Sequence, residues 1–176
     1  MQDVDMVLLS KFRACRYTIG MLQYRASRTQ ESLKVNESDE AIAVLHEFTV
    51  RTTAQACMVD ITSQIAQLVY EQGVDTGTAL LYIPHTTCGL TIQENADPGV
   101  QHDMLMMLQR IVPRQDPHYR HIEDNSASHL QSSSMGFSHF VFIEQGRLVL
   151  GHWQAVYLAE FDGPRTRKVL LKILRD

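Results

Sequence analysis

The sequence lacks the features that mark several large classes of protein. Its apolar stretches fall short of the roughly 20 residues that cross a membrane, and its first residues do not form an apolar segment ending in small residues, as in a secretory signal. The three cysteines, Cys15, Cys57 and Cys88, are odd in number and have no metal-ligand spacing. These absences predict a cytoplasmic protein with reduced thiols and no membrane partner.

Basic charge is also scarce. The 16 lysines and arginines are outnumbered by 20 acidic residues, which gives a net charge of −4. Proteins that bind nucleic acids or anionic membranes through their overall field carry a basic excess, so a nucleic-acid partner is not expected. The sequence also has no Gly-rich phosphate loop, dinucleotide fingerprint, serine nucleophile elbow or CxxC pair. The commonest kinase, dehydrogenase, hydrolase and zinc-ribbon classes are therefore excluded.

Strand patterns dominate the chain from residue 46 onward. Alternation or short apolar runs predict strands over 48–52, 79–83, 140–143, 148–150, 155–161 and 169–174. One helix is predicted after Asp60, with an apolar stripe that ends at Gly73, and another from Pro98 to Ile111 behind the cap Asp97. The result is an α+β fold, a β-rich single domain whose mainly antiparallel, sandwich- or barrel-like sheet carries two inserted helices.

Two segments do not follow this pattern. Residues 1–45 are predicted to be an N-terminal extension of the domain formed by 46–176, because the stretch from Arg25 to Glu40 is polar, as in a mobile linker. We expect the domain to fold without it, since such a stretch buries too little surface to offset its ordering entropy. Residues 113–129 are predicted to be a long irregular loop, a kind of segment that is often functional.

Histidines are the most informative polar residues. Five of the eight lie between His118 and His152. Neutral imidazole is the commonest metal ligand, and three imidazoles with one open position form a catalytic metal site. His85, His121 and His129 are therefore candidate ligands for a divalent metal ion, Mg²⁺ or Zn²⁺. The alternative is that they make structural hydrogen bonds or line a pocket without metal.

Other polar candidates have simple structural alternatives. Asp97 precedes a helix whose free N–H groups attract anions, but capping that helix explains Asp97 fully. Arg165 and Arg167 follow the turn 162–164 and either clamp a phosphate or are merely solvated. Cys88 lies close to His85 in the sequence, and we predict a buried thiol there rather than a nucleophile.

Six ordered blocks of residues resemble the YjbQ family, whose members are often called secondary thiamine-phosphate synthases. The blocks are Pro84-His85-Thr86-Thr87, Glu94-Asn95-Ala96-Asp97-Pro98, Tyr119-Arg120-His121, Asn125-Ser126-x-x-His129-Leu130, Gly151-x-Trp153-Gln154 and Phe161-Asp162-Gly163-Pro164-Arg165. The resemblance extends over residues 46–174. One departure is His152, where the family usually has Thr or Ser.

The resemblance implies a compact β-rich fold that assembles as a homotrimer with pockets near the subunit boundaries. It also implies weak thiamine-phosphate synthesis, in which a hydroxymethylpyrimidine diphosphate joins a thiazole phosphate and releases pyrophosphate. A small phosphorylated substrate is therefore expected. A metal ion or arginines would neutralise the departing group. Two alternatives stay open: a non-catalytic trimer that binds a metal or an anion, and a metal-dependent hydrolase.

The resemblance also marks the recurring polar positions of these blocks as one candidate site, without assigning their individual roles. The catalytic candidates are His85, Asn95, Asp97, Asn125 and Gln154, and the substrate- or phosphate-binding candidates are Thr86, Thr87 and Arg165. We expect His85, His121 and His129 to converge in one pocket, with Asn95 and Asp97 close by.

Overall fold

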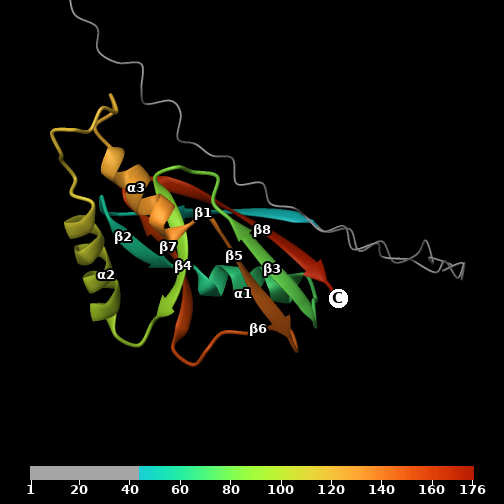
Figure 1. The fold of residues 1–176 in the computed structure, drawn as a ribbon. Helices are drawn as coiled ribbons and strands as arrows, with labels where there is room; N and C mark the ends of the chain where they lie inside the picture. Colours follow the sequence, from blue (N-terminus) through green and yellow to red (C-terminus); the bar gives the residue numbers. More distant parts are fainter. Residues whose placement is uncertain (1–43) are drawn as a thin grey trace, which may run out of the picture. The chain divides into compact units, whose positions relative to one another are not determined.

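The computed structural model describes residues 44–176, which form two antiparallel sheets and three helices (Figure 1). The strands are β1 Leu45–Arg51, β2 Cys57–Asp60, β3 Gly77–Tyr82, β4 Cys88–Glu94, β5 Ser138–Glu144, β6 Arg147–Leu148, β7 Gln154–Glu160 and β8 Thr166–Arg175, and the helices are α1 Thr62–Glu71, α2 Pro98–Ile111 and α3 Ser126–Met135. The predicted N-terminal extension lies outside the described residues, apart from its last two. No helix in this part of the chain is long and apolar enough to cross a membrane.

The two sheets are a five-stranded one, ordered β1-β8-β3-β5-β6, and a three-stranded one, ordered β2-β7-β4. Every strand pair is antiparallel. The predicted α+β fold with an antiparallel, sandwich- or barrel-like sheet is therefore confirmed. Helices α1 and α2 are the two that the sequence predicts, and α3 is an additional one.

One hydrophobic core lies between the sheets. The larger sheet contributes inward side chains such as Leu81 and Leu171, the smaller sheet contributes Leu90 and Leu158, and α1 adds one apolar face that includes Ile65. Each of these side chains is fully buried. Burying one such side chain contributes about 1.5–3 kcal/mol, so this shared core holds the two sheets together.

The helix ends form as the sequence predicts. The carboxylate of Asp97 accepts a hydrogen bond from the backbone N–H of Gly99 at 2.7 Å, with Pro98 as the first helical residue of α2. Asp60 accepts from the N–H of Thr62 at 2.9 Å at the start of α1. Gly73, whose φ is +59°, follows the end of α1 in the left-handed conformation that glycine adopts readily.

Helix α3 corrects the predicted loop 113–129, because its helical residues begin at Ser126. Its buried face is Ala127, Ser128, Gln131 and Ser132, and α3 packs against β4 and β7 (Figure 1). The hydroxyl of Ser128 donates to the carbonyl of Phe161 at 2.7 Å, and that of Ser132 donates to the carbonyl of Thr86 at 2.6 Å. The helix therefore has no apolar stripe for a sequence pattern to reveal.

A close approach of β4 to the end of α3 depends on Gly89. A Cβ atom at this position would lie 2.7 Å from the carbonyl oxygen of Gly136, which is too close for any side chain. The N–H of Leu90 donates to that same oxygen at 3.0 Å. Glycine at position 89 therefore lets α3 bond directly to the edge of the smaller sheet.

Candidate functional site

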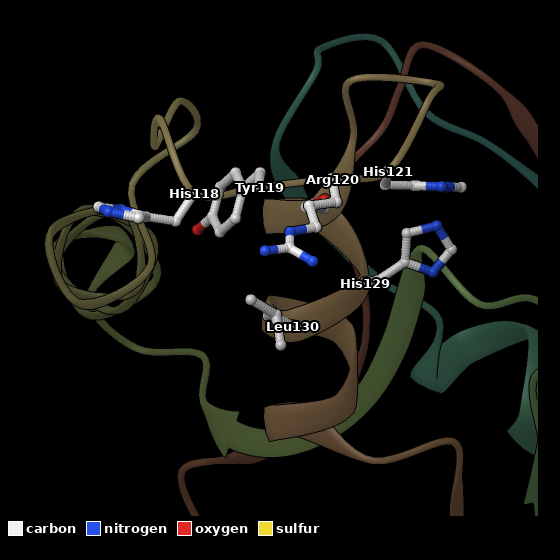
Figure 2. Close-up of a pocket in the computed structure, with 7 residues that line it drawn as sticks. His118, Tyr119, Arg120, His121, His129 and Leu130 are labelled. Atoms are coloured by element: carbon white, nitrogen blue, oxygen red, sulfur yellow. The ribbon is translucent and has the colours of Figure 1, made fainter. Parts of the chain in front are cut away.

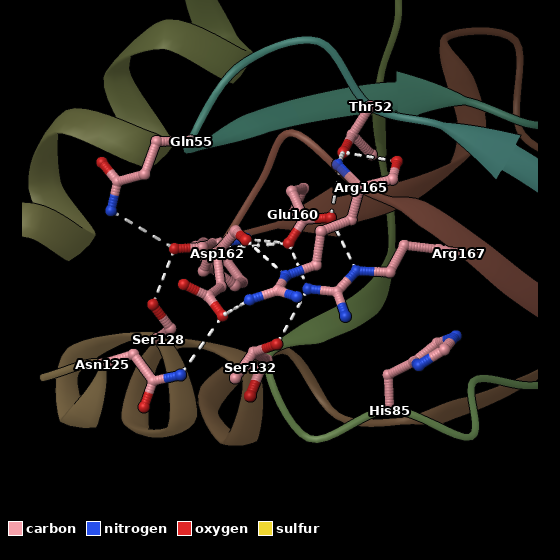
Figure 3. Close-up of polar contacts among 12 residues, drawn as sticks. Thr52, Gln55, His85, Asn125, Ser128, Ser132, Glu160, Asp162, Arg165 and Arg167 are labelled. Carbon is pink, nitrogen blue, oxygen red and sulfur yellow. Dashed lines mark hydrogen bonds and ion pairs between the residues drawn. The ribbon is translucent and has the colours of Figure 1, made fainter. Parts of the chain in front are cut away.

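A buried ion pair joins the two sheets at one end. Arg167 of β8 donates through Nε to Oε2 of Glu160 at 2.7 Å and through Nη2 to Oε1 at 2.5 Å (Figure 3). Glu160, in β7 of the smaller sheet, is fully buried, and Arg167 is only 5% exposed. Charges removed from water in this way are tolerated only when they are paired and hydrogen-bonded.

The remaining lone pairs of Glu160 are also satisfied. Thr52 donates to Oε2 at 3.1 Å, and the backbone N–H groups of Phe161 and Asp162 donate to Oε1 at 3.0 and 2.9 Å. Burial acts to raise the pKa of Glu160, but the hydrogen bonds from Arg167, Asp162 and Thr52 outweigh it and lower the pKa below its usual value of 4.5. The carboxylate is therefore ionised at neutral pH.

Thr87, a candidate for phosphate binding, belongs to this cluster. Its hydroxyl oxygen accepts from Nη2 of Arg167 at 2.8 Å, and the residue is buried. Thr87 is thus a structural partner of the ion pair. Thr86 next to it is exposed, and its carbonyl receives the hydroxyl of Ser132.

His85 lies in the loop between β3 and β4, where its ring binds a backbone N–H of β8 beyond the end of β3. The last residue pair of β3 and β8 is Tyr82–Leu170, and beyond it the backbone N–H of Lys168 donates to Nε2 of His85 at 2.9 Å. Because Nε2 accepts, the proton of the neutral ring is assigned to Nδ1. Burial and the positive charges of Arg167 and Lys168 lower the pKa of His85 from 6.5, with Glu160 acting against them. His85 is therefore a neutral donor through Nδ1–H at pH 7.

The candidate metal ligands are only partly brought together. The rings of His121 and His129 meet edge to face, with centroids 5.1 Å apart. The neutral ring of His85 uses its Nε2 lone pair for Lys168 and carries the proton on Nδ1, so it has no lone pair left for a metal. Within residues 44–176, no group of three or more His, Cys, Asp or Glu side chains is placed to hold a metal ion. These donors do not make a metal site by themselves, and the expected Mg²⁺ or Zn²⁺ stays a prediction.

An open groove of about 570 Å³ lies at the N-terminus of α3 (Figure 2). Its polar lining is His118, Tyr119, Arg120, His121, Ser126 and His129. Arg120 brings a positive charge, and no carboxylate is among the residues that line the groove. Ser126 opens α3, where the free N–H groups and the positive end of the helix dipole favour anions.

Asn125, which precedes α3, and Arg165 are linked through Asp162. Oδ2 of Asp162 accepts from Nη2 of Arg165 at 2.6 Å and from Nδ2 of Asn125 at 3.2 Å. The side chain of Arg165 is about half exposed, at 52%. Both predicted residues are thus at the same end of the sheets as His85, and each is hydrogen-bonded to Asp162.

The other three catalytic candidates, Asn95, Asp97 and Gln154, lie at the opposite end of the smaller sheet. The register of β4 against β7 runs from Cys88–Glu160 to Glu94–Gln154, which spans about 20 Å at the usual rise of a strand. Residues 88–94, which the sequence analysis does not assign to a strand, are extended and carry the chain away from His85. The expected convergence of Asn95 and Asp97 with the histidines is therefore not found within one chain.

Each of these three side chains makes hydrogen bonds within its own surroundings. Oδ1 of Asn95 accepts from the hydroxyl of Tyr157 at 2.5 Å, and its Nδ2 donates to Asp60 at 2.9 Å. Oε1 of Gln154 accepts from the backbone N–H of Gly151 at 2.8 Å, and Asp97 caps α2. The geometry assigns them turn-forming and capping contacts.

Cys88 is a buried thiol, as predicted. Burial raises its pKa to about 12, so it is not a thiolate nucleophile near neutral pH. The sequence analysis missed Glu160, although one signal was available. It is an acidic residue at the end of the otherwise apolar run Ala155–Phe161, and such a residue needs a buried partner.

We expect His85 to titrate below its usual pKa of 6.5, because burial and Arg167 both disfavour the charged ring. The midpoint can be measured by NMR on protein with labelled histidine. Replacing the ion pair by glutamines (Glu160→Gln with Arg167→Gln) removes the larger of the opposing charge effects, that of Arg167, and should raise the midpoint toward 6.5. A wild-type midpoint at or above 6.5 would contradict this account.

Known proteins match most of the chain. The family model described as "UPF0047 protein YjbQ-like" matches residues 46–176. UPF0047 protein YugU of Bacillus subtilis is 45% identical over 131 residues, which are 74% of this chain and 99% of that protein. A UPF0047 protein of Methanocaldococcus jannaschii is 42% identical over 135 residues, 77% of this chain and 97% of that protein.

Solved structures agree with this assignment. A YjbQ/UPF0047 protein of Clostridium acetobutylicum has a TM-score of 0.71 at 45% identity, covering 73% of this chain and 99% of that one. A conserved hypothetical protein of Thermus thermophilus has a TM-score of 0.69 at 44% identity, with the same coverage. These names assign no reaction, so function has to be inferred from the site. The matches do show that this chain belongs to the YjbQ-like UPF0047 family.

Proposed function

We propose that the groove at the N-terminus of α3 binds a small phosphorylated molecule and that the protein is an enzyme acting on it. The observation that carries this proposal is the lining of the groove. It combines Arg120, the adjacent rings of His121 and His129 and the start of a helix, with no carboxylate among its lining residues. Guanidinium and imidazole N–H groups together with a helix N-terminus are the protein groups that best receive phosphate oxygens.

We propose that this groove carries out weak thiamine-phosphate synthesis. This synthesis is a side activity, and the proposal does not name the main reaction of the enzyme. The activity that the YjbQ resemblance implies supports the proposal, as does the chemistry of the groove. Departure of pyrophosphate from the pyrimidine diphosphate develops negative charge on oxygen. Donors that are already in place stabilise such charge without reorganisation. Arg120 and His129 are the side chains to which we assign this role.

The test supplies the pyrimidine diphosphate, the thiazole phosphate and Mg²⁺, and measures thiamine phosphate. Arg120→Gln and His129→Gln should each lose activity on the order of 10²-fold, as when one donor to a developing charge is removed, with unchanged melting. The matched control is His102→Gln, because the side chain of His102 is 77% exposed on α2, outside the groove. Equal trace activity in all four proteins would contradict catalysis and leave the non-catalytic anion-binding protein as the better account.

We also propose that copies of the chain assemble through the outer face of the five-stranded sheet, as the homotrimer that the resemblance implies. Leu80 and Tyr82 of β3, Phe140 and Phe142 of β5 and Leu174 of β8 are exposed on this face. The register places Leu80 beside Phe140, so the apolar side chains of β3 and β5 are contiguous, whereas Thr78 separates Phe142 from Leu174 of β8. A contiguous apolar surface of this kind is typical of protein interfaces, and closed symmetric assembly covers it with a second copy.

A further inference from the structure

One terminal nitrogen of Arg167 remains available after the buried ion pair is formed. Nε and Nη2 make all the hydrogen bonds of this guanidinium, to Glu160 and Thr87, and Nη1 has no hydrogen-bond partner in residues 44–176. The one side-chain nitrogen or oxygen in this range that is both sealed from solvent and unpaired is Oδ1 of Asn125. Nη1 of Arg167 is therefore within reach of solvent. Figure 3 shows it without a dashed line, on the side of the guanidinium where His85 lies.

The second available donor is Nδ1–H of His85. Its partner nitrogen, Nε2, is bound to the backbone of Lys168, the residue that follows Arg167 in β8. The two side chains are thus anchored to neighbouring residues of one strand. Among the charges that act on His85, Arg167 has the largest effect, and it lowers the pKa of the ring. Each side chain is fixed by other bonds and offers one unused donor.

We propose that Nη1 of Arg167 and Nδ1–H of His85 together bind one oxyanion, a phosphate or a carboxylate group of a ligand. Glu160 is the positioning residue of this site. Its two bonds to Nε and Nη2 fix the plane of the guanidinium, so that Nη1 is directed without loss of side-chain entropy on binding.

The site carries little net charge. Glu160 neutralises Arg167, and His85 is neutral, so the site offers an anion two hydrogen-bond donors rather than an uncompensated positive charge. The inference deepens the proposed function, because it supplies a second anionic contact for a phosphorylated substrate, but its binding test needs no turnover.

The test is NMR titration of full-length protein with inorganic phosphate and, separately, with acetate. The signals followed are the ring of His85 and the backbone amide of Lys168. Both should shift saturably with at least one of the two anions, and the anion that saturates at the lower concentration identifies the source of the oxyanion. Loss of one charge-assisted hydrogen bond should weaken binding about tenfold or more, and that loss is expected in two variants.

The first variant, Arg167→Lys, keeps a cation for Glu160 and removes the forked donor. The second, His85→Gln, can place Oε1 near the position of Nε2 to accept from Lys168, and it loses Nδ1–H. Arg147→Gln, at an exposed arginine of β6, is the matched control and should bind as the wild type does. Should Arg167→Lys unfold, the neutral pair Glu160→Gln with Arg167→Gln replaces it, with the same weakened binding expected.

Two results would overturn the inference: no saturable shift in the wild type with either anion, or equal affinity in the Arg167 variants and the wild type. The outcome is separate from that of the activity assay. Saturable binding by a protein that makes no thiamine phosphate would retain this site and remove the proposed reaction. Thiamine-phosphate synthesis without binding at His85 would retain the reaction and remove this site.

Discussion

Arg167→Met is expected to destabilise the fold by about 3–5 kcal/mol, the usual cost of leaving one partner of a buried ion pair alone. The reason is the complete burial of Glu160, whose carboxylate would keep only Thr52 and two backbone N–H groups as donors. Urea unfolding at pH 7 measures the loss as a lower midpoint. A further substitution, Glu160→Gln, should recover most of it, because the amide oxygen can still accept from the backbone and no charge remains.

The dependence on pH provides a second check of this prediction. In the wild type the pKa of Glu160 is lowered in the folded state, so its contribution to stability is present above 4.5 and is lost as the pH falls through the folded-state pKa. In Arg167→Met, the hydrogen bonds and charge of Arg167 no longer counteract burial, so burial raises the pKa of Glu160. The difference between variant and wild type should therefore shrink as the pH is lowered. A difference that stays constant from pH 7 to acid would show that packing, rather than charge, accounts for the loss.

Phe142→Glu is expected to abolish assembly. Phe142 is 57% exposed on the outer face of the five-stranded sheet, so a glutamate there is solvated in a single chain, but it would be buried without a partner between copies. Sedimentation equilibrium should show the mass of three chains for the wild type and of one chain, 20.1 kDa, for the variant.

The control for this prediction is Phe142→Leu, which keeps the face apolar and should retain the wild-type mass. Phe142→Glu should also melt cooperatively, because the inward face of β5 is unchanged, with Val141 and Ile143 still in the core. A wild type that sediments as a monomer, or a glutamate variant that stays assembled, would show that this face is not the interface.

The parts of the fold that the sequence predicted are those with strong local signals. Helix α2 has a capping carboxylate and a proline at its start, and α1 has an apolar stripe and a terminating glycine, Gly73. Strand β4 was not predicted because Gly89 interrupts its pattern and polar residues surround it. Helix α3 was not predicted because serines form much of its buried face. In both cases the decisive contacts come from distant parts of the chain.

The candidate site residues likewise fall into those whose placement follows from local sequence and those whose placement does not. His121 and His129 are joined by one short loop and a turn of helix, and they do meet. Asn95 is close to His85 in the sequence, but a fully extended strand separates the two in space. Glu160 and Arg167 are only seven residues apart, but they lie in different sheets, so their partnership depends on how the two sheets face each other. The only sign of this ion pair in the sequence is that Glu160 and Arg167 stand at strand positions where an apolar residue is expected.

The hydroxyl contacts of α3 have a consequence for how this region tolerates mutation. Ser128 and Ser132 bond to the carbonyl oxygens of Phe161 and Thr86, not to their side chains. Every amino acid carries such an oxygen, so a substitution at position 86 keeps the acceptor for Ser132. The side chain of Thr86 is also exposed, so replacing it disturbs no packing. The helix that carries His129 is thus insulated from side-chain variation in that loop, whereas a shift of the loop backbone would move it directly.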